Sequence, residues 1–226
     1  MPPAFHPRFS DLPAEIAIFP LDGALLLPGG RLPLNIFEPR YLAMTEDALA
    51  HGRMFGMIQP NPQEPQGTTG PGLYRIGCLG RLSQFEETDD GRLLITLSGL
   101  IRFAIVEELA PHQGGFRRAR ADYGAYAADL EPAAITLDRP ELEAAMRAYF
   151  RAQGISVEWN AIAGTPDPML LTTLSMACPF EPREKQALLE AETPARRAAM
   201  LIALMQIGAA SAPPSASEDP SRSKLS

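Results

Sequence analysis

The chain has 226 residues, of which 46% are hydrophobic, and its formal net charge is −7. This length fits one large domain or two small ones with a sizeable core, and the acidic balance argues against a phosphate-tracking surface of the kind that nucleic-acid binders use. No apolar run approaches the ~18 residues that a membrane span needs. The first residues lack the basic start and unbroken apolar stretch of a secretory signal, so we expect a cytoplasmic protein.

The first half of the chain is predicted to be β, because short apolar runs alternate with turn signals. Asp22-Gly23 separates the first two runs, and Pro28-Gly29-Gly30 separates the second from the third. Asp and Gly tolerate the positive φ angles of tight turns. Pro33 makes the third run an edge strand, or one that enters from a loop. These signals predict strands at 16–21, 24–27, 32–37 and 54–59.

A clearer β region follows an exposed loop that is predicted at 60–71. A hairpin turn is expected at Asp90-Gly91, and Ser98-Gly99 is expected to end the strand that follows it. Several strands that are separated by turns favour a barrel or a compact antiparallel sheet. One helix interrupts them, beginning at Pro39 and ending at Gly52. The strands of this region are predicted at 73–87, 92–98, 101–109 and 116–123.

The second half is predicted to be helical. Asp138 and Glu141 supply an N-cap and a capping-box glutamate around an early proline, an apolar stripe follows, and Gly154 ends this helix. A cap followed by proline opens three further helices, at Asp167-Pro168, Glu181-Pro182 and Thr193-Pro194, the last of which is expected to end at Gly208. The predicted organisation is an N-terminal extension at 1–14, a β part at 15–125, a helical bundle at 126–208 and a disordered tail at 209–226.

The sequence holds no recognisable catalytic constellation. It lacks the G-x-x-x-x-G-K-[ST] phosphate-binding loop and the G-x-S-x-G nucleophile elbow. Acidic neighbours at 86–90 could hold a hard cation, although solvated turn carboxylates are the better interpretation. Cys78 and Cys178 lie far apart, so we expect buried thiols and no disulfide framework. We therefore predict no catalytic residue, no metal site and no cofactor.

One stretch, residues 19–41, reads FPLDGALLLPGGRLPLNIFEPRY. It resembles the N-terminal signature of Lon-type ATP-dependent proteases, in which Phe-Pro-Leu, Pro-Gly and Phe-Glu-Pro-Arg-Tyr follow one another. Here these are Phe19-Pro20-Leu21, Pro28-Gly29 and Phe37-Glu38-Pro39-Arg40-Tyr41. The resemblance continues in the expected order through 55–56, 77–80, 99–103 and 184–190. Any one piece is weak, but the ordered set is specific and covers most of residues 15–208.

The resemblance implies a Lon substrate-binding domain, which is an α+β fold with a PUA-like β pseudo-barrel followed by a C-terminal helical bundle. The ATPase and Ser-Lys peptidase domains of full Lon proteases do not follow in these 226 residues. The resemblance therefore implies a stand-alone domain that recognises unfolded or client polypeptides and is not itself an enzyme. Its partners would include a separate protease or chaperone, with no membrane, and its oligomeric state stays open.

Three alternatives remain open. The PUA-like half suggests a nucleic-acid binder that would use Arg117, Arg118 and Arg120, although the acidic total and few aromatic residues argue against it. A peptidase or an enzyme related to ATP-dependent proteases would need the motifs that the sequence lacks. A structural adaptor is the third possibility.

Residues of the signature have two predicted roles, one in shaping the fold and one in contacting polypeptide. Pro28, Gly29, Glu38 and Pro39 are expected to shape a corner of the fold, since glycine relieves the steric clash of a tight reversal and proline begins the helix. Arg40 is expected to pair with Glu38 or a neighbouring strand.

A domain that receives unfolded chains needs exposed apolar surface or a free strand edge, because neither demands one sequence. Concentration at the predicted barrel corner makes five residues candidates for polypeptide contact. They are Phe37, Arg40, Tyr41, Phe55 and Met57.

Overall fold

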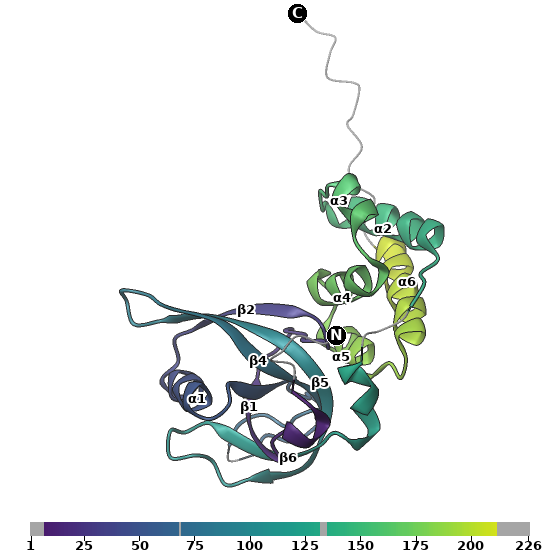
Figure 1. The fold of residues 1–226 in the computed structure, drawn as a ribbon. Coiled ribbons are helices and arrows are strands. Elements are labelled where there is room, and N and C mark those ends of the chain that lie inside the picture. Colours follow the sequence, from purple (N-terminus) through teal and green to yellow (C-terminus); the bar gives the residue numbers. More distant parts are fainter. Residues whose placement is uncertain (1–6, 68, 132–134, 212–226) are drawn as a thin grey trace, which may run out of the picture.

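The strands, with one helix among them, occupy one half of the molecule and the remaining α-helices occupy the other, as Figure 1 shows for the computed structural model. The structure describes residues 7–67, 69–131 and 135–211. Within these described ranges, the β half contains six strands and one long helix, and the second half contains five α-helices. The β half comprises β1 (Glu15–Pro20), β2 (Arg31–Ile36), α1 (Pro39–Ala50), β3 (Met54–Ile58), β4 (Ile76–Glu87), β5 (Leu93–Leu109) and β6 (Arg117–Asp122). The second half comprises α2 (Arg139–Gln153), α3 (Trp159–Gly164), α4 (Asp167–Ala177), α5 (Pro182–Glu190) and α6 (Pro194–Ser211). Short 3₁₀ helices lie at Phe9–Asp11 and Gly124–Leu130.

The sheet closes on itself. Its strand order is β2-β5-β4-β3-β1-β6, and an additional pairing joins β6 back to β5. The ring therefore runs β5-β4-β3-β1-β6, and β2 pairs with the first half of β5 from outside the ring. The β1–β3 pair is parallel, and the other pairs are antiparallel. The edge position predicted from Pro33 is confirmed.

The long strand β5 corrects the prediction that Ser98-Gly99 ends a strand. The chain continues through this dipeptide, and the pairing with β4 shifts by one residue at Gly80 and Gly99. A β-bulge bends a strand without ending it. Because of this bend, the first half of β5 pairs with β2 and its second half pairs with β6.

The apolar run 24–27 is not a strand, contrary to expectation. Leu25, Leu26 and Leu27 are buried, yet they form no ladder. The run is held at the bulge instead, since Gly29 donates its backbone N–H to the Gly99 carbonyl (3.0 Å) and Gly99 donates to the Gly30 carbonyl (2.9 Å). A Cβ atom on Gly99 would lie 2.0 Å from the Leu27 carbonyl oxygen. This contact explains the glycine at position 99, because only glycine allows so close an approach.

Local signals placed most helix ends correctly. The Asp138 side chain accepts a hydrogen bond from the Glu141 backbone N–H (3.1 Å), and Gly154 has a φ of +67°. The helix α3 was not predicted, and α6 continues through Gly208 to Ser211. The remainder of the predicted tail, 212–226, and the first six residues of the predicted extension lie outside the described residues.

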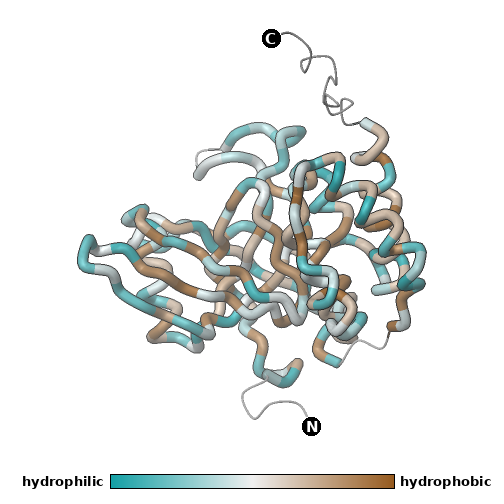
Figure 2. Tube along the Cα trace, turned by 90° about the horizontal axis from the view of Figure 1, so that it is seen from above, coloured by the Kyte–Doolittle hydropathy of each residue, from teal (hydrophilic) through white to brown (hydrophobic). Residues whose placement is uncertain are grey.

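The two halves share one apolar core. A single cluster of buried side chains reaches from Phe19 in β1 to Leu201 in α6, and a second cluster lies within the barrel. Figure 2 shows hydrophobic segments both among the strands and along the helices, with hydrophilic residues at the projecting loop tips. Helix α5 contributes polar contacts across the same boundary, because Gln59 donates to Gln186 (3.0 Å) and Lys185 donates to the Gly23 carbonyl (2.7 Å).

Candidate polypeptide-binding surfaces

The predicted corner is held by short-range contacts. Glu38 is the N-cap residue of α1 and Pro39 is its first residue. The Arg40 guanidinium donates to Glu38 Oε2 from Nε (3.0 Å) and Nη2 (2.9 Å), and it lies 4.5 Å from the centroid of the Tyr41 ring. Gly29 has a φ of +76°, where other residues are strained. The Tyr41 ring packs against Phe19, with the ring centroids 4.1 Å apart.

Three of the five predicted contact residues lie in the core. Tyr41, Phe55 and Met57 have exposed fractions of 6%, 0% and 3%. Their side chains offer almost no area to a polypeptide in this structure, so the expectation of direct contact is corrected for them. The cause is geometric: β3 lies between β1 and β4, and its apolar side chains fill the space under α1. Burial also raises the pKa of the Tyr41 hydroxyl, so the phenol stays neutral.

Exposed apolar side chains gather where β2, β4 and β5 project from the barrel. Phe37 directly follows β2 and is 62% exposed, while Phe85 in β4 is 45% exposed and Leu94 in β5 is 41% exposed. Beside β2, a shallow hollow of about 770 Å³ is formed by the three strands. We call this region the hairpin surface. It comprises Phe37 and the lining of the hollow: Pro33, Leu34, Asn35, Ser83, Gln84, Phe85, Glu86, Leu94, Ile95 and Thr96.

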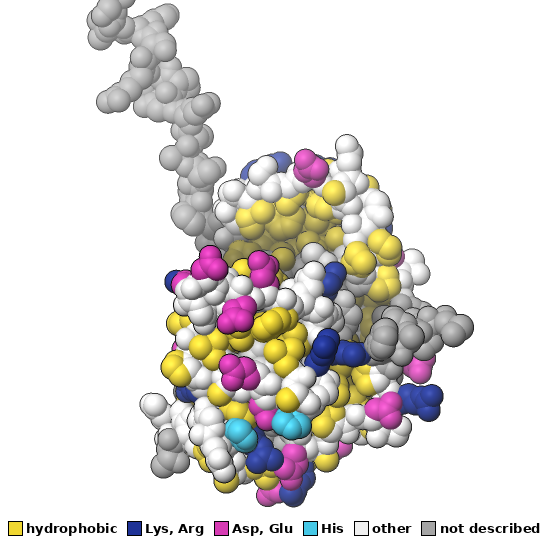
Figure 3. All heavy atoms as spheres, turned by 60° about the vertical axis from the view of Figure 1, so that its left-hand side comes forward, with side chains coloured by type: hydrophobic (Ala, Val, Ile, Leu, Met, Phe, Trp, Pro, Cys, Tyr) yellow, Lys and Arg dark blue, Asp and Glu magenta, His cyan; other side chains and the backbone are white. Residues whose placement is uncertain are grey.

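Acidic side chains border the hairpin surface. Glu86 belongs to it, and Glu87 and Asp89 follow in the exposed hairpin. Figure 3 shows apolar side chains on this half with acidic side chains among them, and an apolar-lined hollow on the helical half above. Asp90, by contrast, pairs with Arg92 (2.8 Å) and accepts from Thr88, and these contacts lower the pKa of its carboxyl.

The outer edge of β2 is open to another strand among the described residues, but proline weakens it. Pro33 pairs with Thr96 of β5 in the middle of the strand. Proline lacks a backbone N–H, and prolines within sheets occupy edges where the nitrogen faces away from the partner strand. An incoming strand would therefore meet a missing donor in the middle of this edge, which favours contact through side chains over strand addition.

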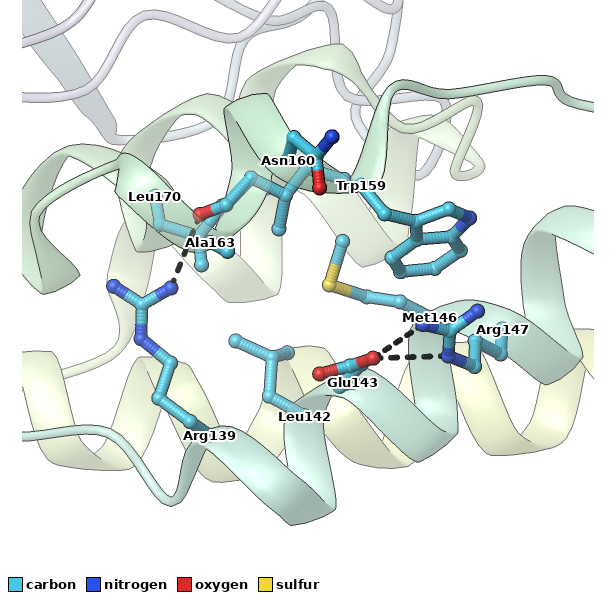
Figure 4. Close-up of a pocket in the computed structure, with 10 residues that line it drawn as sticks. Arg139, Leu142, Glu143, Met146, Arg147, Trp159, Asn160, Ala163 and Leu170 are labelled. Carbon is cyan, nitrogen blue, oxygen red and sulfur yellow. Dashed lines mark hydrogen bonds and ion pairs between the residues drawn. The ribbon is translucent and has the colours of Figure 1, made fainter.

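A cleft of about 450 Å³ lies in the helical half, between α2, α3 and α4. Figure 4 shows its apolar interior between two arginines, Arg139 at one end and Arg147 at the other. The Arg147 guanidinium lies 3.9 Å from the centroid of the Trp159 ring and donates to Glu143 Oε1. Sequence reasoning missed this cleft, since α3 carries neither a cap signal nor a long periodic pattern. Its apolar lining comprises Leu142, Met146, Trp159, Ile162, Ala163 and Leu170.

The basic cluster proposed for nucleic acid is neutralised by glutamates. Arg117 forms an ion pair with Glu108 (2.7 Å), and its side chain is buried. Arg118 pairs with Glu15 (2.7 Å), and Arg120 pairs with Glu107. Three arginines that face three glutamates present no net positive field to phosphates. The geometry therefore argues against a nucleic-acid interface here.

The cysteines are free and buried, as predicted. Burial raises the pKa of Cys178 to about 12 and raises that of Cys78 further. Both thiols therefore stay protonated and unreactive at neutral pH.

Within the described ranges, no group of three or more His, Cys, Asp or Glu residues is arranged to hold a metal ion. No described helix combines the length and apolarity that crossing a bilayer requires.

A barrel that carries a helical bundle is also the fold of solved Lon N-terminal domains. A Lon N-terminal domain protein from Xanthomonas campestris superposes with a TM-score of 0.57 and 23% identity, covering 84% of this chain and 97% of that one. The N-terminal domain of a Mycobacterium avium complex Lon protease gives the same TM-score at 16% identity. At these identities the likeness establishes the fold alone.

The sequence comparison establishes the family. The model of the ATP-dependent protease La (LON) substrate-binding domain matches residues 15–206, so the chain belongs to this family. Lon protease 2 of Myxococcus xanthus is 26% identical over 126 residues, which are 54% of this chain and 15% of that protein. Lon protease 1 of Syntrophotalea carbinolica is 28% identical over 170 residues, which are 74% of this chain and 20% of that protein. The chain thus spans only a small part of the length of these curated relatives.

Proposed function

We propose that this chain binds segments of unfolded polypeptide through the hairpin surface, and that it does not itself hydrolyse ATP or peptide bonds. The observation that carries the proposal is the exposure of Phe37, Phe85 and Leu94 on one projecting end of the sheet. Isolated exposed apolar residues are ordinary, but Phe85 and Leu94 line one hollow and Phe37 directly follows the strand beside it, and such a grouping is typical of an interaction site. Membership of a substrate-binding family supports the same function.

The size of the surface predicts weak and permissive binding. Burying a patch of about 400 Å² at about 25 cal/mol per Å² would gain roughly 10 kcal/mol before costs. Loss of translational and conformational freedom on association offsets a similar amount. The net affinity is therefore expected to be micromolar or weaker, which suits a module that must release its clients.

The acidic residues around the hairpin surface favour some polypeptide segments over others. Glu86, Glu87 and Asp89 repel acidic segments and favour neutral or basic ones, with an effect that salt screens. Pro33 disfavours a client that adds as a strand, so apolar side chains are expected to supply most of the affinity. The same acidic border, together with the neutralised arginines 117, 118 and 120, disfavours nucleic acid as the ligand.

A titration with an unfolded, basic polypeptide tests the proposal. Fluorescently labelled lysozyme, reduced and carbamidomethylated so that it cannot refold, should bind saturably in an anisotropy assay. A double substitution, Phe37→Ser with Phe85→Ser, should weaken binding about tenfold or more because it removes the largest exposed apolar groups. Val106→Ser is the matched control, since Val106 is exposed on β5 away from the hollow. Equal affinity of the double variant and the control would contradict the proposal.

The non-enzymatic part has its own test. The purified chain should show no hydrolysis of ATP or casein above a heat-inactivated sample, and turnover that a single point substitution abolishes would overturn this part. Binding to a separate protease, as an adaptor would show, can be measured by pull-down with and without client. Location in the cytoplasm stays a prediction.

A further inference from the structure

We propose that the cleft between α2, α3 and α4 is a second peptide-binding site, selective for a large apolar side chain that is followed by a carboxylate. The site goes beyond the hairpin surface in position and in chemistry, since it lies in the helical half and has arginines in its lining where the hairpin surface has a glutamate. Its occupant would be a short extended stretch of a client chain.

The interior of the cleft fits an apolar side chain. Leu142, Met146 and Leu170 form a buried floor, and half-buried Trp159 and Ile162 from α3 face it. The volume of about 450 Å³ falls within the range of about 300–1,000 Å³ that is typical of ligand clefts. Ala163 and Asn160 lie exposed at the mouth, so a chain can lay one side chain inward while its backbone stays outside.

One end of the cleft can hold a carboxylate. Two arginines and one glutamate line the cleft, Arg139, Arg147 and Glu143, and the carboxylates of Asp167 and Glu143 balance the two arginines in the unliganded chain. The Arg139 guanidinium is already engaged, because it pairs with Asp167 and donates to the carbonyls of Ile162 and Thr165. Arg139 therefore fixes the end of α3 and forms a wall of the cleft.

Arg147 is the group that can accept a ligand. Its pair with Glu143 is about half exposed on both sides, so the pair contributes little and can be exchanged. The two bonds to Glu143 come from Nε and Nη2, which leaves further N–H donors of the guanidinium for a second carboxylate. Stacking on Trp159 holds the guanidinium plane at the mouth of the cleft, and a fixed plane suits bidentate carboxylate binding.

The single tryptophan of the chain, Trp159, gives a direct readout. Three blocked peptides without tryptophan serve as probes: Ac-ALFEA-NH₂, its lysine counterpart Ac-ALFKA-NH₂, and Ac-AAAEA-NH₂, which lacks the large apolar side chains. Trp159 emission and, independently, calorimetry of the full chain should show that the first peptide binds at least about fivefold more tightly than the other two.

Two substitutions on α3 locate the site. Ala163→Phe fills the mouth of the cleft without removing any core contact and should weaken the first peptide about tenfold or more, whereas Ala161→Phe on the outer side of the same helix should change affinity less than about twofold. Arg147→Gln should make the glutamate and lysine peptides bind alike.

The proposal is overturned if calorimetry detects no binding of the first peptide at millimolar concentration, if Ala163→Phe binds as the unaltered chain does, or if the glutamate and lysine peptides bind equally. Each of these results leaves the hairpin surface untouched, because unfolded lysozyme and the Phe37 and Phe85 variants test that surface separately.

Discussion

Arg102 and Asp129 form a two-pronged ion pair at the boundary between the barrel and the helices. Arg102 Nε lies 2.8 Å from Asp129 Oδ2, and Nη2 lies 2.8 Å from Oδ1. The same guanidinium donates from Nη1 to the carbonyls of Leu189 (3.2 Å) and Ala191 (2.7 Å), at the end of α5. One buried side chain on β5 therefore satisfies four acceptor atoms from two other parts of the chain.

Replacing Arg102 should destabilise the whole protein. Arg102→Met leaves Asp129 and two carbonyls without their donor in a buried site, and breaking such a pair typically costs about 3–5 kcal/mol in free energy of unfolding. Urea unfolding followed by circular dichroism measures the change. Arg92→Met is the matched control, since the Arg92–Asp90 pair is exposed and should cost less than about 1 kcal/mol. Similar losses in the free energy of unfolding for the two variants would contradict the prediction that the buried Arg102 pair stabilises the fold more than an exposed pair does.

Gly99 should tolerate no side chain. Gly99→Ala places a methyl group against the Leu27 carbonyl and forces the 24–30 segment away from the β4–β5 bulge. We expect a loss of about 1–3 kcal/mol in the free energy of unfolding, as for other overpacked sites. Gly164→Ala, whose added methyl meets nothing within 4 Å, should be neutral or slightly stabilising. Thermal unfolding of the two variants in parallel gives the comparison, and an unchanged midpoint for Gly99→Ala would contradict the packing described.

Pro33 should limit strand addition at β2. Pro33→Ala restores a backbone N–H at the middle of the sheet edge, so an extended chain can complete its ladder there. We expect a severalfold gain in affinity for unfolded lysozyme and a greater tendency to self-associate, measured by anisotropy and by light scattering. Pro65→Ala, in an exposed loop, is the control and should change neither property. No gain in either measurement would indicate that clients never approach this edge.

Stability should fall at alkaline pH, in part because of Cys178. Burial raises the pKa of this thiol to about 12 in the folded chain, against about 8.5–9 in an unfolded one. Between these values the folded state holds the proton and the unfolded state has lost it, so the free energy of unfolding decreases as pH rises. One thiol contributes at most about 1.4 kcal/mol per pH unit.

The contribution of the thiol can be measured against a background of buried tyrosines. Tyr149 also has a pKa raised to about 12, first by burial and then by the charge of Cys178, and it is present in both proteins of the comparison. Cys178→Ala should therefore unfold in urea with a shallower decline of stability above about pH 9 than the unaltered chain, under reducing conditions. Parallel declines would show that the thiol ionises as freely in the folded state as in the unfolded one.

The features that sequence predicted well are those set within a few residues. Caps and early prolines marked the starts of α2, α5 and α6, because they satisfy or spare backbone donors locally. At α4 only the proline did so, since the Asp167 carboxylate accepts from Leu137 and Arg139 and does not cap the helix. Pro33 predicted the edge strand because proline lacks a backbone N–H for a second neighbouring strand. The turn at Gly29 was also readable, since its positive φ is a local requirement.

The features that sequence missed depend on distant partners. Ser98-Gly99 was predicted to end a strand, but its geometry is a bulge that the β4 pairing and the docked segment 24–30 impose. Phe55 and Phe37 both belong to the family signature, yet one is fully buried and the other is largely exposed. Membership of a motif does not give the direction of a side chain. The cleft at Trp159 depends on α2 and α4, which lie before and after α3 in the chain.

The shared core and the contacts of α5 bear on how relatives can be compared and recombined. Gln186, Lys185 and the carbonyls at the end of α5 meet partners directly after β3, on the loop after β1 and on β5. A chimera that joins the barrel of one relative to the helices of another would therefore mismatch these partners and the apolar packing around them. Exchange of single loops or surface residues between relatives should preserve folding. Exchange of a whole barrel or a whole helical half should fail unless the residues on both sides of the boundary between them are exchanged together.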